Sequence, residues 1–551
     1  MINDKSDLIR TRKSTKNLFF HGVLALTVAN LIVKAVGLIS KIALNRVVGS
    51  IGAGYYSSAY EIYAYLYVIS TAGLPVALSI MIAKSRSKGR LLEARKIFDI
   101  AILLFLSIGF VFSSFMIAFS KQLSGVIGAP DTAMCIVAIA PTMLFICISS
   151  CIRGYFQGYQ LMGPTALSQL IEAICKVGIG VSLALWARSR GYADHIVASY
   201  TILGVTIGVL LGMIYLYIRK LFFKDTQYFS NFELSTEKRS TRLILREMLK
   251  IAIPITLSSS VLSLTTVLDT LMVQKRLLAY GMSEMSVRIF YGDYTSLVIS
   301  MFTLPTIFLY PIANSLVPVI ATAHERGDKE REDRLRSLSV RIITIIAMPC
   351  AIGLGAFSKP ILGLLMFKED SVERASVWLS IASASVLFLG LISITNSFLN
   401  SVGKEKLPII SMLVGASVKL VSNYILLGKI GILGAPISTV LCYAVASSLN
   451  IIFVIKHVGV LPSVGKTLLR PFACAGISIG TSAVMYYFLP SRIDFKIGVL
   501  LAIALSAALY IILIFKSKTI TEDELSVIPS SKKLIKLLRK LKILPKISEN
   551  V

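Results

Sequence analysis

Long apolar stretches recur through most of the 551-residue chain, from about residue 17 to residue 516. Each is close to the roughly 20 residues that an α-helix needs to cross the hydrocarbon core of a membrane. The segments between them are too short to fold as separate soluble domains. The chain is therefore predicted to be an all-α polytopic membrane protein. Its charged residues, at 16%, agree with this because soluble domains carry about 25%.

Charged residues, glycines and prolines divide the apolar sequence into fourteen predicted transmembrane helices. Their ranges are 17–46, 55–83, 97–119, 131–153, 164–187, 196–218, 251–274, 289–322, 341–357, 375–400, 407–427, 432–455, 470–489 and 496–515. Most of the 57 Lys and Arg residues fall in the chain ends and in alternate loops, and loops rich in these residues stay in the cytoplasm. The sequence predicts a multi-pass protein of the cytoplasmic membrane with both termini inside.

The net charge of +28 would suggest a nucleic acid partner in a soluble protein. No soluble module with a basic, aromatic surface is present, so the charge is interpreted as a determinant of topology and of attraction to anionic lipids. The expected partners therefore include membrane lipids and exclude nucleic acid.

The two halves of the chain resemble each other weakly and in the same direction. Residues 73–95 and 312–334 share a proline, small residues, a basic turn and a glycine, and residues 157–176 and 400–419 share Gly, then Pro, then Lys. Parallel six-helix repeats are typical of transporters, although proline and small residues are also common in membrane helices generally. The predicted organisation is a cytoplasmic tail (1–16), an N-lobe (17–223), a linker (224–250), a C-lobe (251–456), two extra C-terminal helices (468–516) and a basic amphipathic cytoplasmic tail (517–551).

Ionisable residues inside predicted spans are costly and usually face a cavity or a partner. In the first span, Asn30, Lys34, Lys41 and Asn45 fall on one helical face. Such a stripe is predicted to bind the phosphates of an anionic head group. The alternative is that the lysines neutralise carboxylates in a packed bundle.

The second span places Tyr56, Tyr60, Tyr63 and Tyr67 on one face and Glu61 on another. Tyrosine rings and hydroxyls with one carboxylate would suit a sugar. The alternative is an interfacial belt of tyrosines.

Two further spans carry buried cations. Ser168, Glu172 and Lys176 follow one another at four-residue spacing in the fifth span, where Lys176 could contact substrate or form an ion pair with Glu172. Lys419 and Asn423 lie one turn apart in the eleventh span, at the position that corresponds to Lys176 in the repeat. The intramembrane cations outnumber the carboxylates, which favours an anionic substrate.

The seventh span carries Ser258, Thr265, Asp269 and Arg276 on one face. A single carboxylate among hydroxyls suits a sodium ion or a proton. Either ion could drive transport, and no other cofactor is predicted.

No enzyme site is predicted. The sequence shows no phosphate-binding glycine loop, zinc signature or nucleophile elbow, and the four histidines are scattered. The seven cysteines lie in or beside apolar segments and are expected to be buried, apolar residues. A catalytic or metal-binding role is therefore not expected.

The sequence resembles the multidrug/oligosaccharidyl-lipid/polysaccharide exporter superfamily, and within it the lipid II flippases and the stage V sporulation protein B group. The motifs that carry the resemblance are GLISKIALNRVVGSIGAGYY (37–56), RGYFQGYQLMGPTALSQLIE (153–172) and YGDYTSLVISMFTLPTIFLYPIANSLVPVIA (291–321). The resemblance implies a V-shaped fold of two lobes that moves an undecaprenyl-pyrophosphate-linked peptidoglycan precursor, lipid II, to the outer leaflet by alternating access.

The resemblance also implies roles for single residues. The first-span arginine of the flippases corresponds to Lys41, and an eighth-span arginine of some members corresponds to Tyr294. The aspartate of the family's sodium site corresponds to Asp269 and its asparagine to Asn423, but the expected second carboxylate is Leu427. A sodium ion, a proton or the membrane potential therefore all stay open as the driving force.

The predicted function is a flippase for a lipid-linked oligosaccharide, with lipid II as the first candidate and cell-wall synthases as possible partners. The predicted substrate-binding residues are Asn30, Lys34, Lys41, Asn45, Glu61, Lys176 and Lys419, and the predicted ion-coupling residues are Asp269 and Asn423. The alternatives are a flippase for another undecaprenyl-linked glycan, of the capsule, teichoic acid or O-antigen type, and a multidrug/cation antiporter.

Overall fold

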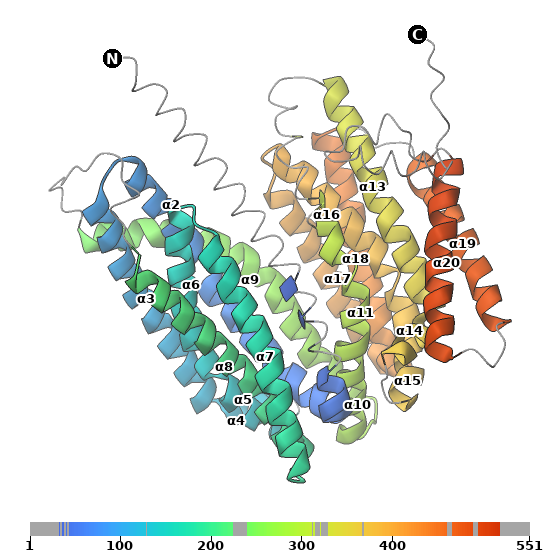
Figure 1. Ribbon diagram of the computed structural model, residues 1–551, viewed down its shortest axis with the longest axis horizontal. Coiled ribbons are helices and arrows are strands. Elements are labelled where there is room, and N and C mark those ends of the chain that lie inside the picture. The colour runs from blue at the N-terminus through green and yellow to red at the C-terminus, as the bar shows by residue number, and fades with distance from the viewer. Residues whose placement is uncertain are drawn as a thin grey trace. The chain divides into compact units, whose positions relative to one another are not determined.

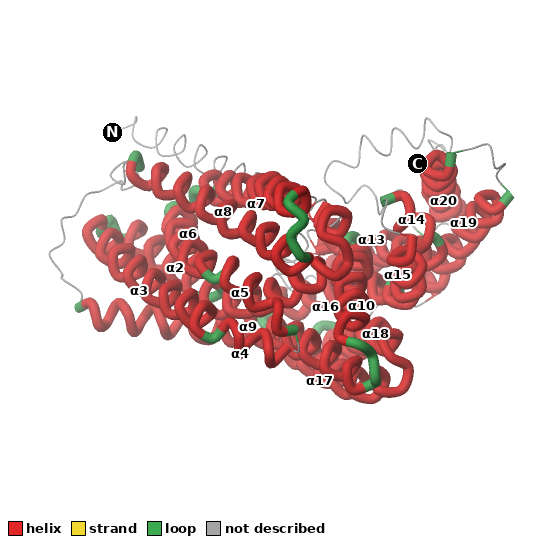
Figure 2. The backbone as a smooth tube through the Cα atoms, turned by 90° about the horizontal axis from the view of Figure 1, so that it is seen from below, coloured by secondary structure: helices red, strands yellow, loops and turns green. Residues whose placement is uncertain are grey.

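The computed structural model is helical wherever it describes regular structure (Figure 2). It describes residues 32–33, 36–37, 40, 43–127, 129–223, 240–310, 312–313, 320, 329–365, 369–459, 465–488, 494–517 and 519, without the side chains of 258–259, 261–268, 331 and 466. By their contacts the residues form two compact units, Met1–Ser296 and Leu297–Val551.

The first unit begins with helical residues 43–71 and is built from helices (Figure 1). The helices that follow are α2 (Leu74–Ser87), α3 (Leu91–Ala118), α4 (Ser120–Ile127), η1 (Pro130–Thr132), α5 (Ala133–Ile139), α6 (Pro141–Gly158), α7 (Gly163–Ser189), α8 (Asp194–Leu221), α9 (Thr241–Ala279), α10 (Glu284–Asp293) and the first half of the π-helix η3 (Tyr294–Ile299). Gly49 has a φ of 75°, which a right-handed helix cannot continue through. The turn predicted between the first two spans therefore falls at Gly49.

Helices α7 and α8 approach each other closely because α8 presents glycines to its neighbour. A Cβ added to Gly204 would lie 2.9 Å from the carbonyl oxygen of Lys176, and one added to Gly208 would lie 2.8 Å from that of Glu172. Gly212 continues the row against Ser168. This GxxxGxxxG pattern lets two membrane helices pack backbone against backbone.

The second unit contains helices from α11 to α20. They are α11 (Ser300–Thr303), α13 (Lys329–Ala356), α14 (Ser358–Leu364), α15 (Glu369–Ala382), α16 (Ser385–Ser401), α17 (Lys406–Ile430), η4 (Gly431–Leu433), α18 (Gly434–His457), the π-helix η5 (Gly465–Leu469), α19 (Arg470–Tyr487) and α20 (Phe495–Lys516). Helices α17 and α18 pack along each other, and Gly431, with a φ of 62°, makes the turn between them.

Nine helices among the described residues are long and apolar enough to cross a membrane, or ten if α15 and α16, bent by 41°, form one span. The sequence predicted fourteen. Two of the nine, Ala43–Ser87 and Lys406–His457, contain the turns at Gly49 and Gly431 and overlap two predicted spans each. The helices that hold the predicted seventh and eighth spans are not among the nine, and most of the first span lies outside the described residues.

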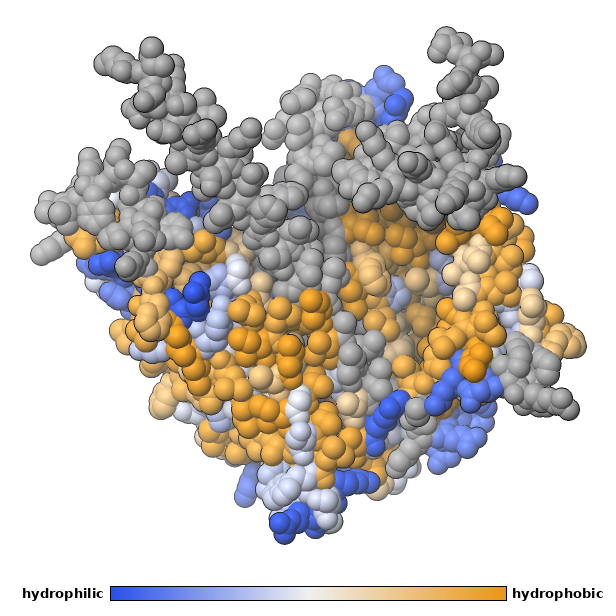
Figure 3. Space-filling model, viewed as in Figure 1, coloured by the Kyte–Doolittle hydropathy of each residue, from blue (hydrophilic) through white to orange (hydrophobic). Residues whose placement is uncertain are grey.

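Apolar side chains are exposed along many of these helices, as expected for surfaces that face lipid (Figure 3). They include Leu103 and Phe110 on α3 and Leu500 on α20. Within each unit, the core combines aliphatic and aromatic side chains, such as Phe105 and Tyr155 in the first unit and Phe302 and Phe398 in the second, with buried hydroxyls between them. The molecule therefore has the surface of a multi-pass membrane protein.

The contacts divide the chain at residues 296 and 297, whereas the predicted lobes are separated by the linker at 224–250. Helix α9 belongs with the first unit because it packs on α2, where Gly73 lies directly against the backbone of Ala252. The lobe boundaries stay a prediction. Most of the linker and both predicted tails lie outside the described residues.

Candidate functional site

Four tyrosines of the second predicted span form a continuous row along the helical stretch 43–71. The ring centroids of Tyr56 and Tyr60 are 5.9 Å apart, those of Tyr60 and Tyr63 are 5.7 Å apart, and those of Tyr63 and Tyr67 are 6.0 Å apart. Spacings of three and four residues bring the rings onto one face, as the sequence predicted. We call these residues the tyrosine row.

Lys176 of α7 lies over the tyrosine row. Its Nζ is 4.7 Å from the centroid of the Tyr60 ring, and its charge also acts on the hydroxyl of Tyr56. The side chain is partly buried, which makes a cation–π contact stronger than at a fully exposed site. Lys176 therefore places a positive charge at an aromatic surface inside the first unit.

Arg153 of α6 supplies a second buried cation, which sequence reasoning missed. Its side chain is 9% exposed, Nη2 is 2.8 Å from Oε2 of Glu172, and Nε donates to the hydroxyl of Ser168 at 3.0 Å. Glu172 therefore forms its ion pair with Arg153 rather than with Lys176. Because Glu172 is engaged in this way, Lys176 is left to interact chiefly with the tyrosine row.

The predicted cationic stripe of the first span can be located only in part. Asn30, Lys34 and Lys41 lie outside the described residues. Asn45 is buried, with 2% of its surface exposed, and its Nδ2 donates to the hydroxyl of Ser296 at 2.9 Å. In this conformation Asn45 joins two helical segments.

The predicted acidic residues of the first unit lie near one tyrosine. The charges of Glu61 and of Asp269, which is 7% exposed, both act on Tyr291 of α10. The hydroxyl of Tyr291 donates to Oγ1 of Thr270 at 2.9 Å. Asp269 is thus within electrostatic reach of the Tyr291 hydroxyl. The side chains of Ser258 and Thr265 lie outside the described set.

A polar seam joins residues 45–58 to α9, α10 and η3. Gln274 donates to Ser58 at 2.9 Å and Thr295 donates to Ser57 at 3.0 Å, in addition to the bond from Asn45. Gly292 lies directly against the carbonyl oxygen of Ser50. These contacts tie residues 45–58 to α9, α10 and η3 within the first unit.

Arg288 of α10 makes several contacts at one part of the seam. Its Nη1 donates to the hydroxyl of Tyr55 and, at 3.1 Å, to Oδ2 of Asp131. Nη2 is 3.2 Å from Oε2 of Glu284, and the guanidinium lies over the Tyr55 ring. A planar fork of donors is required to reach two carboxylates and one hydroxyl together.

Replacing Arg288 with methionine is expected to lower the free energy of unfolding by about 2 kcal/mol, because charge-assisted hydrogen bonds of a largely buried guanidinium are lost. Lysine should recover only part of this loss, since it cannot form the fork. Thermal unfolding in detergent would measure both. The matched control is Arg188→Met, which breaks a more exposed pair with Asp194 and should cost about 0.5 kcal/mol. Equal effects at the two positions would contradict the role of Arg288.

The predicted residues of the second unit lie on α17. Asn423 is completely buried, as is Leu427 one turn later, where the family's second carboxylate is expected. Lys419 is partly buried. Helices α16 and α18 share an amide pair in which Nδ2 of the buried Asn450 donates to Oδ1 of the partly buried Asn396 at 2.7 Å. The part of the chain that the structure describes has no group of three metal-binding side chains.

Comparison with protein families identifies the chain. The family described as polysaccharide biosynthesis protein matches residues 19–324, which is more than half of the sequence. The chain belongs to this family. The MatE family matches residues 254–425 of the same chain. Membership of the multidrug/oligosaccharidyl-lipid/polysaccharide superfamily, predicted from sequence motifs, is therefore confirmed.

Relatives from Bacillus subtilis match this chain over most of its length. Stage V sporulation protein B of Bacillus subtilis is 22% identical over 524 residues, which span 94% of this chain and 99% of the relative. Lipid II flippase MurJ of the same organism is 24% identical over 516 residues, which span 89% and 94%. The uncharacterised membrane protein YabM, also from B. subtilis, is 24% identical over 536 residues.

Solved structures show the same fold. The inward closed conformation of lipid II flippase MurJ superimposes with a TM-score of 0.65 at 17% identity and covers 89% of this chain and 98% of its own. An inward-facing multidrug resistance MATE transporter gives a TM-score of 0.64 at 15% identity and covers 78% and 97%. With the family match, this fold makes the chain a multi-pass membrane transporter of the superfamily and not an enzyme.

Proposed function

We propose that this transporter moves an undecaprenyl-pyrophosphate-linked oligosaccharide, lipid II as the first candidate, from the inner to the outer leaflet by alternating access. The observation that carries the proposal is the Lys176 ammonium over the tyrosine row. A lysine can bind the phosphates of such a substrate, and aromatic faces can contact its sugars. A cation already at the aromatic surface disfavours a cationic drug at the same place.

Further residues are proposed to contribute to the same function. Lys34 and Lys41 would engage the pyrophosphate, with Asn30 and Asn45 beside them on the same helical face. Glu61 would contact the glycan, and Lys419 would be a further positively charged substrate-binding residue. Asp269 and Asn423 would couple transport to a sodium ion or a proton. Both termini would lie in the cytoplasm, and the protein would act in the cytoplasmic membrane beside cell-wall synthases.

The direct test is to deplete the lipid II flippase of a Gram-positive host and to supply this protein instead. Rescue of growth by the wild type would support lipid II as the substrate. Rescue should be lost with Lys41→Ala if the first-span stripe binds the pyrophosphate. Absence of rescue at normal expression would contradict lipid II and would favour another undecaprenyl-linked glycan.

Lys176→Met is expected to slow flipping of fluorescent lipid II in proteoliposomes by about tenfold, the effect of losing about 1.4 kcal/mol of charge-assisted binding. Lys176→Arg should retain most of the activity because the charge is kept. Lys121→Met, at an exposed position on α4, removes the same charge and should leave the rate unchanged. A wild-type rate for Lys176→Met in correctly folded protein would remove Lys176 from the site.

A further inference from the structure

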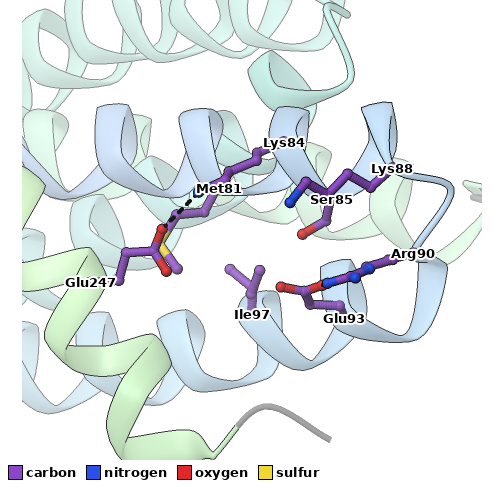
Figure 4. A pocket seen from close by; sticks show the side chains of 8 residues that line it. All are labelled: Met81, Lys84, Ser85, Lys88, Arg90, Glu93, Ile97 and Glu247. Carbon is purple, nitrogen blue, oxygen red and sulfur yellow. Dashed lines mark hydrogen bonds and ion pairs between the residues drawn. The ribbon is translucent and has the colours of Figure 1, made fainter. Parts of the chain in front are cut away.

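A small polar pocket lies between the C-terminal end of α2, the start of α3 and α9 (Figure 4). Its volume is about 230 Å³. This is below the range of about 300–1,000 Å³ that is typical of pockets for drug-sized ligands, so the pocket suits a small head group rather than a whole glycan. It shares no residue with the tyrosine row, and by the predicted topology it opens at the cytoplasmic side.

The pocket carries an excess of positive charge. Lys84, Lys88 and Arg90 line it together with Glu93 and Glu247. Lys84 is 3.3 Å from Glu247, and Arg90 is 3.5 Å from Glu93. Lys88 has no carboxylate within ion-pair distance among the described residues and points into the pocket. One cation is thus available to an incoming anion.

Two uncharged donors are also directed at the pocket. Ser85 is 3% exposed, turns its hydroxyl toward the pocket, and makes no side-chain hydrogen bond to any other described residue. The 28-residue helix α3 begins here, and the side chain of its N-cap residue, Arg90, makes no capping hydrogen bond. Buried hydroxyls normally have partners, and uncapped N–H groups at a helix start attract anions. Both features fit a phosphate.

Exposed apolar side chains on the two helices that line the pocket suggest where the phosphate comes from. Ile80 on α2, four residues before Lys84, is 48% exposed, and Leu92 on α3, next to Glu93, is 51% exposed. Their exposed surfaces would suit acyl chains. We propose that the pocket binds the phosphodiester of an anionic phospholipid, with Lys88 and Ser85 as its main ligands. This inference does not depend on the identity of the transported substrate.

Glu247 allows a second test, in which the expected change in anion binding has the opposite sign. Its carboxylate holds Lys84 and adds negative charge to the pocket, so a bound phosphate competes with it. Glu247→Gln should release Lys84 and tighten anion binding. Lys88→Gln should weaken it. Each charge near a membrane surface changes anionic lipid binding about fivefold, so the two variants should differ by more than tenfold.

The experiment uses the full chain, stripped of lipid in detergent. The protein is titrated with phosphatidylglycerol, phosphatidylcholine or inorganic phosphate. Native mass spectrometry counts the bound lipid. The wild type should retain phosphatidylglycerol in preference to phosphatidylcholine. Lys88→Gln should retain about fivefold less and Lys88→Arg nearly as much as the wild type. Lys250→Gln, an exposed charge loss on α9 outside the pocket, should have no effect.

Three outcomes would overturn the proposal. Unchanged retention by Lys88→Gln would show that lipid binds elsewhere. Weaker binding by Glu247→Gln would show that the carboxylate helps rather than competes. If inorganic phosphate protected the protein against thermal unfolding as strongly as phosphatidylglycerol, the acyl chains would contribute nothing and the ligand would be a soluble anion.

Discussion

Arg153→Met is expected to lower the free energy of unfolding by about 3 kcal/mol, because it leaves Glu172 without its partner inside the protein. Breaking one side of a buried pair usually costs 3–5 kcal/mol, and the 25% exposure of Glu172 places this pair at the lower end. The hydrogen bond from Nε to Ser168 is lost as well. Chemical or thermal unfolding in detergent would measure the change.

A double-mutant cycle separates the ion pair from simple loss of packing. Glu172→Gln in the Arg153→Met background should restore part of the stability, since the unpaired charge is removed. Lys121→Met is the control for removing one exposed positive charge and should stay within about 0.5 kcal/mol of the wild type. If Arg153→Met and the control unfold alike, the pair does not stabilise the first unit.

Gly204→Val is expected to destabilise the protein by about 3 kcal/mol, because the new side chain has no room between α8 and α7. Even a Cβ would lie 2.9 Å from the carbonyl oxygen of Lys176, and a branched side chain needs much more space. The helices must separate, and the close contact along Gly208 and Gly212 is then lost as well.

Gly178 on α7 provides the matched control. A Cβ at Gly178 would meet nothing within 4 Å, so Gly178→Val makes the same chemical change at an open position. It should alter the free energy of unfolding by less than about 0.5 kcal/mol. A comparable loss at both positions would mean that valine disturbs the helix itself and that close packing at Gly204 is not the cause.

The helices and the tyrosine row could be predicted because both depend on local sequence. Apolar length sets the spans, and the three- and four-residue spacing from Tyr56 to Tyr67 sets their common face. The turn at Gly49 also fell where the loop was expected, since only glycine readily adopts its positive φ.

The partners of the charged residues could not be predicted in the same way. The i, i+4 spacing favoured a pair between Glu172 and Lys176, but tertiary packing brings Arg153 from α6 to Glu172. Arg153 stood at the end of an apolar run and could be taken for a cytoplasmic loop residue. One signal in the sequence pointed to a buried position for Arg153: its positive charge stands beside residues that are otherwise small or aromatic.

The glycine contact between α7 and α8 also couples the movements of these two helices. Gly208 lies against the backbone of Lys176 itself, so the two helices share a contact at the residue that reaches the tyrosine row. Lys176 cannot be displaced by more than a rotamer change unless α8 is displaced with it. A spectroscopic label on the opposite face of α8 would therefore report the position of Lys176 through a transport cycle while leaving every substrate contact unmodified.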